Sequence, residues 1–238
     1  MIPGTGEIYS ILLKTYGKQG WWPVYNAGTS ACMYGTGAPV NDSGRFEIII
    51  GAILTQNIAW KNVEKALGAL INKEILSPSR LHRTKDNMIA ECIRPAGYFN
   101  QKTKKIRNFL DWFRDYNYSF DELDKFKTGI LREKLLGING IGPETADSIL
   151  LYAMNRKIFV VDAYTKRIFS RLKLTDPGDS YDTVQQFFHR EFKGGIKKYN
   201  EFHALIVAHG KDICKNKPSC EKCSISHLCE TRICTIKI

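Results

Sequence analysis

A glycine-rich turn, GINGIG at residues 137–142, separates two segments with helical periodicity and constrains the fold more than any other feature. Glycine permits positive φ and lets an anion such as phosphate approach the backbone. Pro143 follows at the first position of the next helix, where its missing N–H costs nothing and free amides can hold an anion. The turn predicts a helical hairpin with Gly140 and Gly142 as candidate phosphate contacts. A hairpin without a ligand fits the same residues.

Helical periodicity extends over most of the chain, and the fold class that it predicts is all-α. The glycine-rich stretch 17–44 is expected to be irregular. Residues 158–161 could pass for a short strand, but too little strand is expected elsewhere to build a sheet. The expected helical segments are residues 8–16, 46–54, 59–71, 102–116, 120–136, 143–154, 163–172, 183–192 and 198–210.

The charge balance favours a polyanionic partner. Lys and Arg total 35 against 24 Asp and Glu, a net charge of +11. Phosphate contacts by basic side chains release condensed counterions, although simple solubility would also account for such an excess. The N-terminus lacks the basic and apolar regions of a signal peptide, and the apolar stretch 46–54 is too short to span a bilayer. We expect an intracellular protein, of cytoplasm or nucleoid, without a membrane partner.

Four cysteines near the C-terminus form a candidate metal site. Cys214, Cys220, Cys223 and Cys229 are separated by five, two and five residues. Four thiolates on one loop can enclose a soft metal group, and disulfides are rare in a reducing compartment. The surrounding Lys, Pro and Ser residues lack the apolar periodicity of a core segment. The spacing alone leaves zinc and an iron–sulfur cluster open.

Asp162 is the candidate catalytic residue, because it stands at the start of a predicted helix about twenty residues after the hairpin. Aspartate at this position commonly caps the helix by accepting a backbone hydrogen bond. A capped, rigid carboxylate can also act as a general base or stabilise a cation, so the two roles are compatible.

These motifs follow one another in an order that resembles the endonuclease III superfamily of DNA glycosylases. The segments that carry the resemblance are FEIIIGAILTQN, LLGINGIGPETADSILLY, VVDAYTKR and AHGKDIC with the cysteines after it, which together span Phe46 to Cys229. Five residues separate the first two cysteines here, whereas six usually separate them in the family. The other two gaps match, and the resemblance favours a [4Fe–4S] cluster over zinc.

The resemblance implies a two-domain helix-hairpin-helix fold. Residues 44–157 would form a six-helix domain with the hairpin. Residues 1–43 and 158–238 would form a second helical domain carrying the cluster loop at 213–230. A cleft between the domains would take a base flipped out of double-stranded DNA that contains a damaged or mismatched base. A monomer is expected.

The resemblance also implies roles for single residues. Asp162 falls at the catalytic aspartate, which would stabilise an oxocarbenium-like sugar and assist attack by water, as carboxylates do in glycoside hydrolysis. Glu144 stands where strand-cutting members carry a Schiff-base lysine, so a monofunctional enzyme is expected. A bifunctional glycosylase with lyase activity stays an alternative. The residue that fills the hole left by the flipped base falls at Gln56 or Asn57, although a buried polar group that satisfies nearby backbone fits the same pair.

The expected substrate is an alkylated purine such as 3-methyladenine. Trp21, Trp22 and Pro23, followed by Phe46, resemble the type III 3-methyladenine glycosylase branch, in which aromatic rings sandwich the base. Glu144 agrees with that branch. An N-alkylated purine is cationic, and stacking it between aromatic rings gains about 1–2 kcal/mol when water is excluded. The tryptophans could also be plain core residues.

The rival substrates are deaminated or mismatched bases, namely uracil or thymine opposite guanine, or hypoxanthine. Glu47 and Tyr152 are polar groups near the expected pocket that could read a Watson–Crick edge. Two non-enzymatic readings also stay open: a protein that only binds DNA, and a zinc-ribbon interaction protein.

Basic residues of the cysteine loop are candidate DNA contacts in addition to the hairpin glycines. Lys215, Lys217 and Lys222 lie between or beside the cysteines. Ammonium groups there could bind phosphates without reading sequence, and a solvated loop face would have the same composition.

Overall fold

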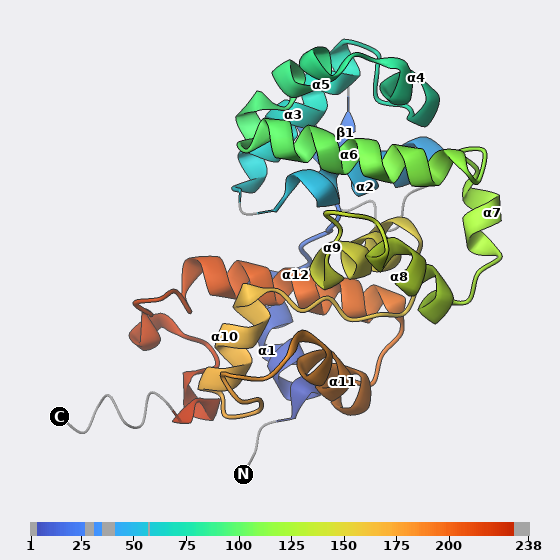
Figure 1. Cartoon of the computed structure of the whole chain (residues 1–238). Coiled ribbons are helices and arrows are strands. Elements are labelled where there is room, and N and C mark those ends of the chain that lie inside the picture. Colours follow the sequence, from blue (N-terminus) through green and yellow to red (C-terminus); the bar gives the residue numbers. More distant parts are fainter. Residues whose placement is uncertain (1–3, 27–30, 35–40, 57, 231–238) are drawn as a thin grey trace. The chain divides into compact units, whose positions relative to one another are not determined.

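The computed structural model describes residues 4–26, 31–34, 41–56 and 58–230, and in this part of the chain helices predominate (Figure 1). The all-α fold class is therefore confirmed. The α-helices are α1 (Thr5–Tyr16), α2 (Asp42–Leu54), α3 (Trp60–Asn72), α4 (Pro78–Arg83), α5 (Asp86–Cys92), α6 (Phe99–Arg114), α7 (Phe120–Asp124), α8 (Thr128–Leu136), α9 (Pro143–Ser148), α10 (Ala163–Arg171), α11 (Tyr181–Glu191) and α12 (Ile196–Asp212). Short helical turns are η1 (Arg94–Ala96), η2 (Ile149–Ala153), η3 (Cys220–Lys222) and η4 (Ser226–Leu228).

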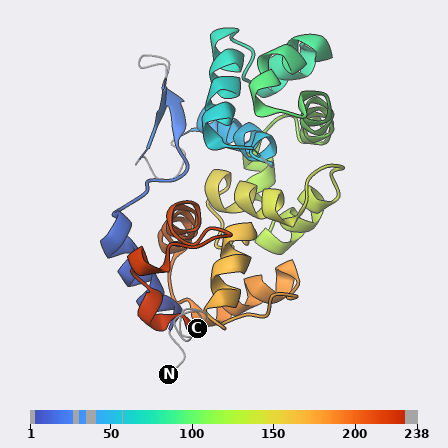
Figure 2. The ribbon, with the colours of Figure 1, turned by 90° about the vertical axis from the view of Figure 1, so that its left-hand side faces the viewer.

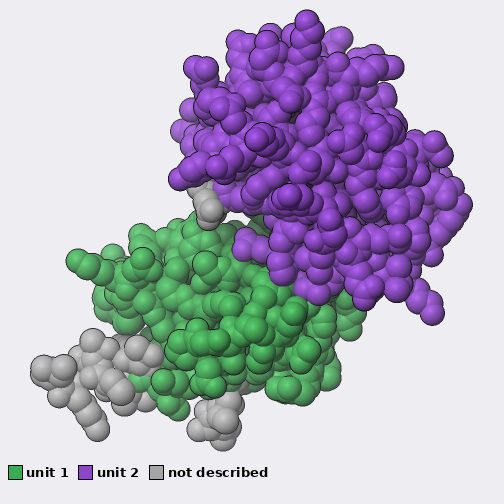
Figure 3. Space-filling model, in the orientation of Figure 1, with its two compact units in different colours: residues 1–21, 157–238 green, residues 22–156 purple. Residues whose placement is uncertain are grey.

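The chain forms two compact units, coloured separately in Figure 3. Unit 1 comprises Met1–Trp21 and Lys157–Ile238, and unit 2 comprises Trp22–Arg156. Unit 1 thus contains α1 and α10–α12, whereas unit 2 contains both strands and α2–α9. No helix among the described residues is long and apolar enough to cross a membrane.

Unit 2 includes a two-stranded antiparallel sheet of β1 (Val24–Asn26) and β2 (Ala31–Met33) that the sequence did not predict (Figure 2). Val24 pairs with Met33, and Tyr25 pairs with Cys32. The Tyr25 ring lies on Gly68 of α3, where a β-carbon would come within 3.1 Å of it. The strands are therefore stabilised by a tertiary contact, which the glycine-rich local sequence does not indicate.

The core of unit 2 surrounds α2, as its continuous apolar run predicts. From Phe46 to Leu54 every residue is buried. A helix that is apolar on all sides must be enclosed by other elements, and here η2, α3 and α6 contact it. The Asn41 side chain caps the helix by accepting from the Gly44 amide at 2.9 Å.

Two predicted helices of unit 2 are interrupted. The segment 120–136 divides into α7 and α8, and Phe126 between them packs edge-on against Tyr116 at 5.7 Å. The helix that begins at Pro143 changes to π winding at Ile149–Ala153. All five residues of this π segment are buried, so tertiary packing accounts for a winding that periodicity cannot reveal.

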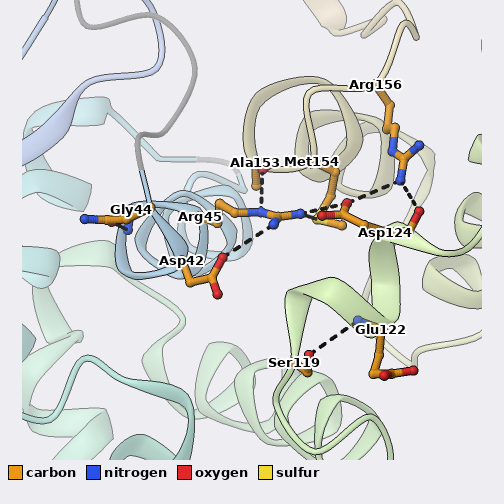
Figure 4. Close-up of polar contacts among 10 residues, drawn as sticks. Asp42, Gly44, Arg45, Ser119, Glu122, Asp124, Ala153, Met154 and Arg156 are labelled. Carbon is orange, nitrogen blue, oxygen red and sulfur yellow. Dashed lines mark hydrogen bonds and ion pairs between the residues drawn. The ribbon is translucent and has the colours of Figure 1, made fainter.

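Arg45 ties α2 to two other segments of unit 2 (Figure 4). Its guanidinium donates to the Ala153 carbonyl at 3.2 Å and to Asp124 Oδ1 at 2.9 Å, and it stacks 4.4 Å above the Phe120 ring. Arg156 donates to the same Asp124 oxygen at 3.2 Å. The Arg45 side chain is 14% exposed and that of Asp124 is 41% exposed, so the guanidinium is largely shielded from water although its partner is not.

Replacing Arg45 by Met should lower the free energy of unfolding by about 1–3 kcal/mol, because the buried Ala153 carbonyl and the Asp124 carboxylate lose their charged donor. The measurement is urea unfolding followed by circular dichroism. Arg114→Met is the matched control, because Arg114 is 57% exposed and its pair with Asp111 should contribute under about 1 kcal/mol. Equal losses in the two variants would contradict the role assigned to Arg45.

Unit 1 has an aromatic core between α10, α11 and α12. Phe159 and Phe188 stack in parallel with centroids 3.8 Å apart, and Phe169 and Phe202 meet Phe188 edge-on. All four rings are buried. Edge-to-face packing of this kind holds helices at fixed separations, which positions the start of α10.

Candidate active site and nucleic-acid interface

The hairpin between α8 and α9 has the geometry that its glycines predict. Gly140 has φ +95°, and a β-carbon there would lie 2.5 Å from Cγ of Lys105 on α6. Both the dihedral and the close approach require glycine at this position. Gly142 is exposed in extended conformation with open space around it, and Pro143 follows at the helix start.

A buried ion pair joins the two helices of the hairpin. Arg132 on α8 donates to both carboxylate oxygens of Asp147 on α9, at 2.8 and 3.1 Å. Asp147 is fully buried, so this bidentate pair is sensitive to loss of either partner. It fixes the angle of the hairpin helices.

Gln56, the predicted hole-filling residue, contacts the hairpin. Its Nε2 donates to the Gly140 carbonyl at 3.3 Å and to the Thr145 hydroxyl at 3.0 Å, and its Oε1 accepts from Lys105. Three contacts of matching polarity define the orientation of the amide. The alternative candidate, Asn57, lies outside the described residues.

The predicted base-pocket residues fall in both units. In unit 2, Trp22 is 5% exposed, and its ring lies 5.4 Å from Trp60 and 5.2 Å from Tyr152. Its indole rests on Gly51 of α2, where a β-carbon would lie 3.2 Å away. Trp21 belongs to unit 1 and is half-buried. In this structure, therefore, Trp22 is a core ring rather than an open platform.

Glu47 is a buried carboxyl in unit 2, beside Phe46, which is fully buried. Burial raises the pKa of Glu47 to about 7, against the opposing effect of a 2.5 Å hydrogen bond from the Tyr25 amide. A carboxyl with this pKa exists in both protonation states near neutral pH, so it can donate or accept a hydrogen bond. Pro23, which precedes β1, is also buried. Glu144 is exposed on the first turn of α9.

Asp162 caps α10 in unit 1, as its position predicts. Its Oδ1 accepts from the Thr165 amide at 2.7 Å and from the Thr165 hydroxyl at 2.8 Å. The other oxygen, Oδ2, lies 3.8 Å from Nε2 of His203 on α12. Asp162 is 9% exposed, so the carboxylate is rigid and largely removed from water. These are properties that suit a general base or a cation stabiliser.

The segment 158–161 leading to Asp162 is buried but is not a strand. Its backbone groups bond to a stripe of α11 side chains spaced four residues apart. Val161 N–H donates to the Tyr181 hydroxyl at 3.3 Å, and Phe159 N–H donates to His189 Nε2 at 3.0 Å. The Gln185 amide donates to the Phe159 carbonyl at 2.6 Å. A helix face thus replaces the sheet partner that an extended segment needs.

The four cysteines of the C-terminal loop are half-buried and form no disulfide. Burial, with smaller contributions from the other three cysteines, raises the pKa of Cys223 to about 11, against the opposing effect of a backbone hydrogen bond from Ile225. Cys214, Cys220 and Cys229 therefore lie within electrostatic reach of Cys223. Arg171 of α10 donates to Cys214 Sγ at 3.2 Å. Over the described residues, no group of three His, Cys, Asp or Glu side chains forms a site for a metal ion. The chemistry of four thiols nevertheless fits a soft-metal group.

The predicted phosphate-binding lysines, Lys215, Lys217 and Lys222, are all exposed on this loop. Arg171 binds the backbone beneath them, donating to the carbonyls of Lys215 at 2.6 Å and Asn216 at 3.1 Å. The ammonium groups are therefore accessible on a loop that a side chain from α10 braces.

Sequence reasoning missed several residues that support these groups. Thr165 could have been identified from the sequence, because it stands three residues after the capping aspartate, where its amide and side chain can bond to the cap. Tyr181, Gln185 and His189 could also have been identified, as a polar stripe with helical spacing. No sequence pattern indicates the contacts of Lys105 and His203, since a lone Lys or His on a helix is ordinarily a solvated or core residue.

Comparison with known proteins identifies the family. The model of the HhH-GPD superfamily of base excision DNA repair proteins matches residues 50–193. A protein of Methanocaldococcus jannaschii described as a DNA repair glycosylase is 41% identical over 94% of each chain. Endonuclease III of Sulfolobus acidocaldarius is 32% identical over 81% of this chain and 84% of its own length.

A solved structure of a DNA glycosylase is also similar to this chain. The 3-methyladenine DNA glycosylase MagIII of Helicobacter pylori, bound to 1,N6-ethenoadenine, has a TM-score of 0.69 and 26% identity over 88% of this chain and 98% of its own. The chain therefore belongs to the HhH-GPD superfamily of base excision DNA repair proteins. The predicted class, a DNA N-glycosylase with a helix-hairpin-helix fold, is confirmed.

Replacing Gly140 by Ala should lower the free energy of unfolding by about 1–3 kcal/mol, since the new β-carbon needs a positive φ and displaces Lys105. Thermal unfolding measures the change. Gly142→Ala is the matched control and should stay within about 0.5 kcal/mol of the parent, because its φ of −90° suits any residue. A similar loss in both variants would show that the turn does not depend on the geometry of Gly140.

Proposed function

We propose that this DNA repair glycosylase is monofunctional and that it excises an alkylated purine, such as 3-methyladenine, from double-stranded DNA. The observation that carries the proposal is the set of aromatic rings around Trp22 on the face of α2 that also bears Glu47. Trp22 rests on Gly51, one helical turn after Glu47, and packs against Trp60 and Tyr152.

This arrangement suits a cationic base. Electron-rich rings attract an alkylated purine, and a carboxyl of pKa about 7 can become the anion that balances its charge. Because Trp22 and Phe46 are buried, their rings must be uncovered before a base can stack on them. The likeness to MagIII, whose structure contains an ethenoadenine, supports the same substrate class.

The chemical step is assigned to Asp162. The glycosidic bond of an alkylated purine is already weakened by the positive charge of the base, so departure needs little acid assistance. A fixed carboxylate then stabilises the oxocarbenium-like sugar and orients the attacking water. Glu144, at the position of the lysine in strand-cutting members, cannot form a Schiff base.

Contacts with the DNA backbone are assigned to two places. The hairpin would offer the backbone of Gly140 and Gly142 to a phosphate. Gln56, whose amide bonds to the same turn, would fill the hole left by the flipped base, with Asn57 as the alternative. The exposed Lys215, Lys217 and Lys222 would add phosphate contacts from the cysteine loop. Such contacts position the duplex and leave base selection to the pocket.

A second candidate is excision of a deaminated or mismatched base. The observation that favours it is again Glu47, because a buried carboxyl in both protonation states can read a Watson–Crick edge. Uracil or thymine opposite guanine and hypoxanthine are the corresponding substrates.

A base-release assay over duplexes with 3-methyladenine, 7-methylguanine, hypoxanthine, uracil and a G·T mismatch separates the candidates. We expect release of the methylated purines, with strand breaks only after alkali. Release restricted to uracil, thymine or hypoxanthine would favour the second candidate, and breaks without alkali would refute the monofunctional proposal. Asp162→Asn is the control: it should bind the duplex normally and release base at least about 100-fold more slowly.

We propose further that Cys214, Cys220, Cys223 and Cys229 hold a [4Fe–4S] cluster. When bound, the cluster would cross-link the loop that carries the lysines and would perform no chemistry on the sugar. The four thiols, the brace from Arg171 and the kinship with endonuclease III support this proposal.

Purified protein should be brown, absorb at about 400 nm and contain about four irons per chain. Cys220→Ser should remove most of this absorbance, whereas Cys92→Ser, in a buried position of unit 2, should keep it. A colourless protein with about one zinc per chain would overturn the iron–sulfur proposal.

A further inference from the structure

The two oxygens of the Asp162 carboxylate have different surroundings. Oδ1 accepts both the amide and the hydroxyl of Thr165, so the cap occupies it. Oδ2 takes no part in the cap and is the oxygen left for chemistry. The imidazole of His203 faces this oxygen, with Nε2 at 3.8 Å.

Helix packing within unit 1 places His203 at this distance. Gly210 of α12 lies against Tyr164 of α10, and a β-carbon at Gly210 would come within 2.5 Å of the Tyr164 ring. The missing side chain lets the two helices approach closely. His203 lies seven residues earlier on α12, on the same face, and Asp162 immediately precedes α10. The approach at Gly210 therefore carries the imidazole to the carboxylate.

The protonation state of the imidazole follows from its surroundings. Burial lowers the pKa of His203, an effect that Asp162 opposes and Lys211 reinforces. Asp162 and Lys211 both lie close enough to the imidazole to act on its pKa. A neutral imidazole has a single N–H, and proximity to a carboxylate favours the tautomer with that hydrogen on Nε2. The ring then presents a donor to Oδ2 while adding no charge.

We infer that His203 is a positioning residue for Asp162: its Nε2–H faces Oδ2, holds the carboxylate in one rotation and favours its ionised form. The inference rests on the catalytic role proposed for Asp162. A separation of 3.8 Å is longer than a hydrogen bond, so the inference requires the pair to close by about 1 Å when the sugar binds, as catalytic hydrogen bonds commonly do. His203 therefore acts through Asp162 and does not itself touch the substrate.

The test compares His203→Leu with His203→Gln in single-turnover base release over a range of pH, with a duplex that the parent enzyme processes. Loss of the donor in His203→Leu should slow release about 10- to 100-fold and move the acid limb of the pH profile upward by about one unit. Affinity for the duplex should stay within about twofold, since no DNA contact changes. His203→Gln, which keeps an N–H near the same place, should recover most of the rate and the parental acid limb.

His82→Leu is the matched control, because His82 Nε2 lies 3.1 Å from Asp111 in unit 2, far from this site in the chain. It should leave both the rate and the pH profile unchanged. If His203→Leu slows release without moving the acid limb, or if Gln rescues neither property, His203 is only a packing residue and the inference is overturned.

The failure of the inference is distinguishable from failure of the proposed function. Parental rates in Asp162→Asn would remove the catalytic role of Asp162 and the inference with it. An inactive Asp162→Asn together with a parental rate and pH profile in His203→Leu would remove the inference alone.

Discussion

An extended, buried segment among helices must find partners for its backbone, and this requirement organises unit 1. Phe159 and Val161 cannot bond to a neighbouring strand, so the α11 stripe of Tyr181, Gln185 and His189 bonds to them instead. The segment is thereby held straight against the aromatic core. Asp162 lies at the end of this segment and caps α10. Its position is therefore fixed by the α11 hydrogen bonds before it and by the capping hydrogen bonds after it.

A similar logic holds the hairpin of unit 2. Gly140 adopts positive φ and packs against the stem of Lys105, while Arg132 and Asp147 clamp α8 to α9. Gln56 bonds to the same turn, so the loop after α2 and the hairpin are parts of one polar network. Rigid backbone presentation is what phosphate contacts need, because amides that are already aligned lose little entropy on binding.

Several features could be predicted from the sequence because their causes are local. The start of α9 at Pro143 and the cap at Asp162 depend on residues within one helical turn. The buried α2 followed from an unbroken apolar run. The division of 120–136, the π winding at Ile149–Ala153 and the β1–β2 sheet could not be foreseen, since each is imposed by contacts with residues far along the chain.

The sequence by itself determined the helical class, the hairpin, the capping aspartate and the set of four cysteines, because dihedral preference, capping and spacing are properties of short segments. Only the tertiary structure decided which oxygen of Asp162 is left beside His203, and that Trp22 is a core ring enclosed by Trp60 and Tyr152. The physical reason is that burial and charge around a side chain come from neighbours that packing brings together, such as α10 and α12 at Gly210.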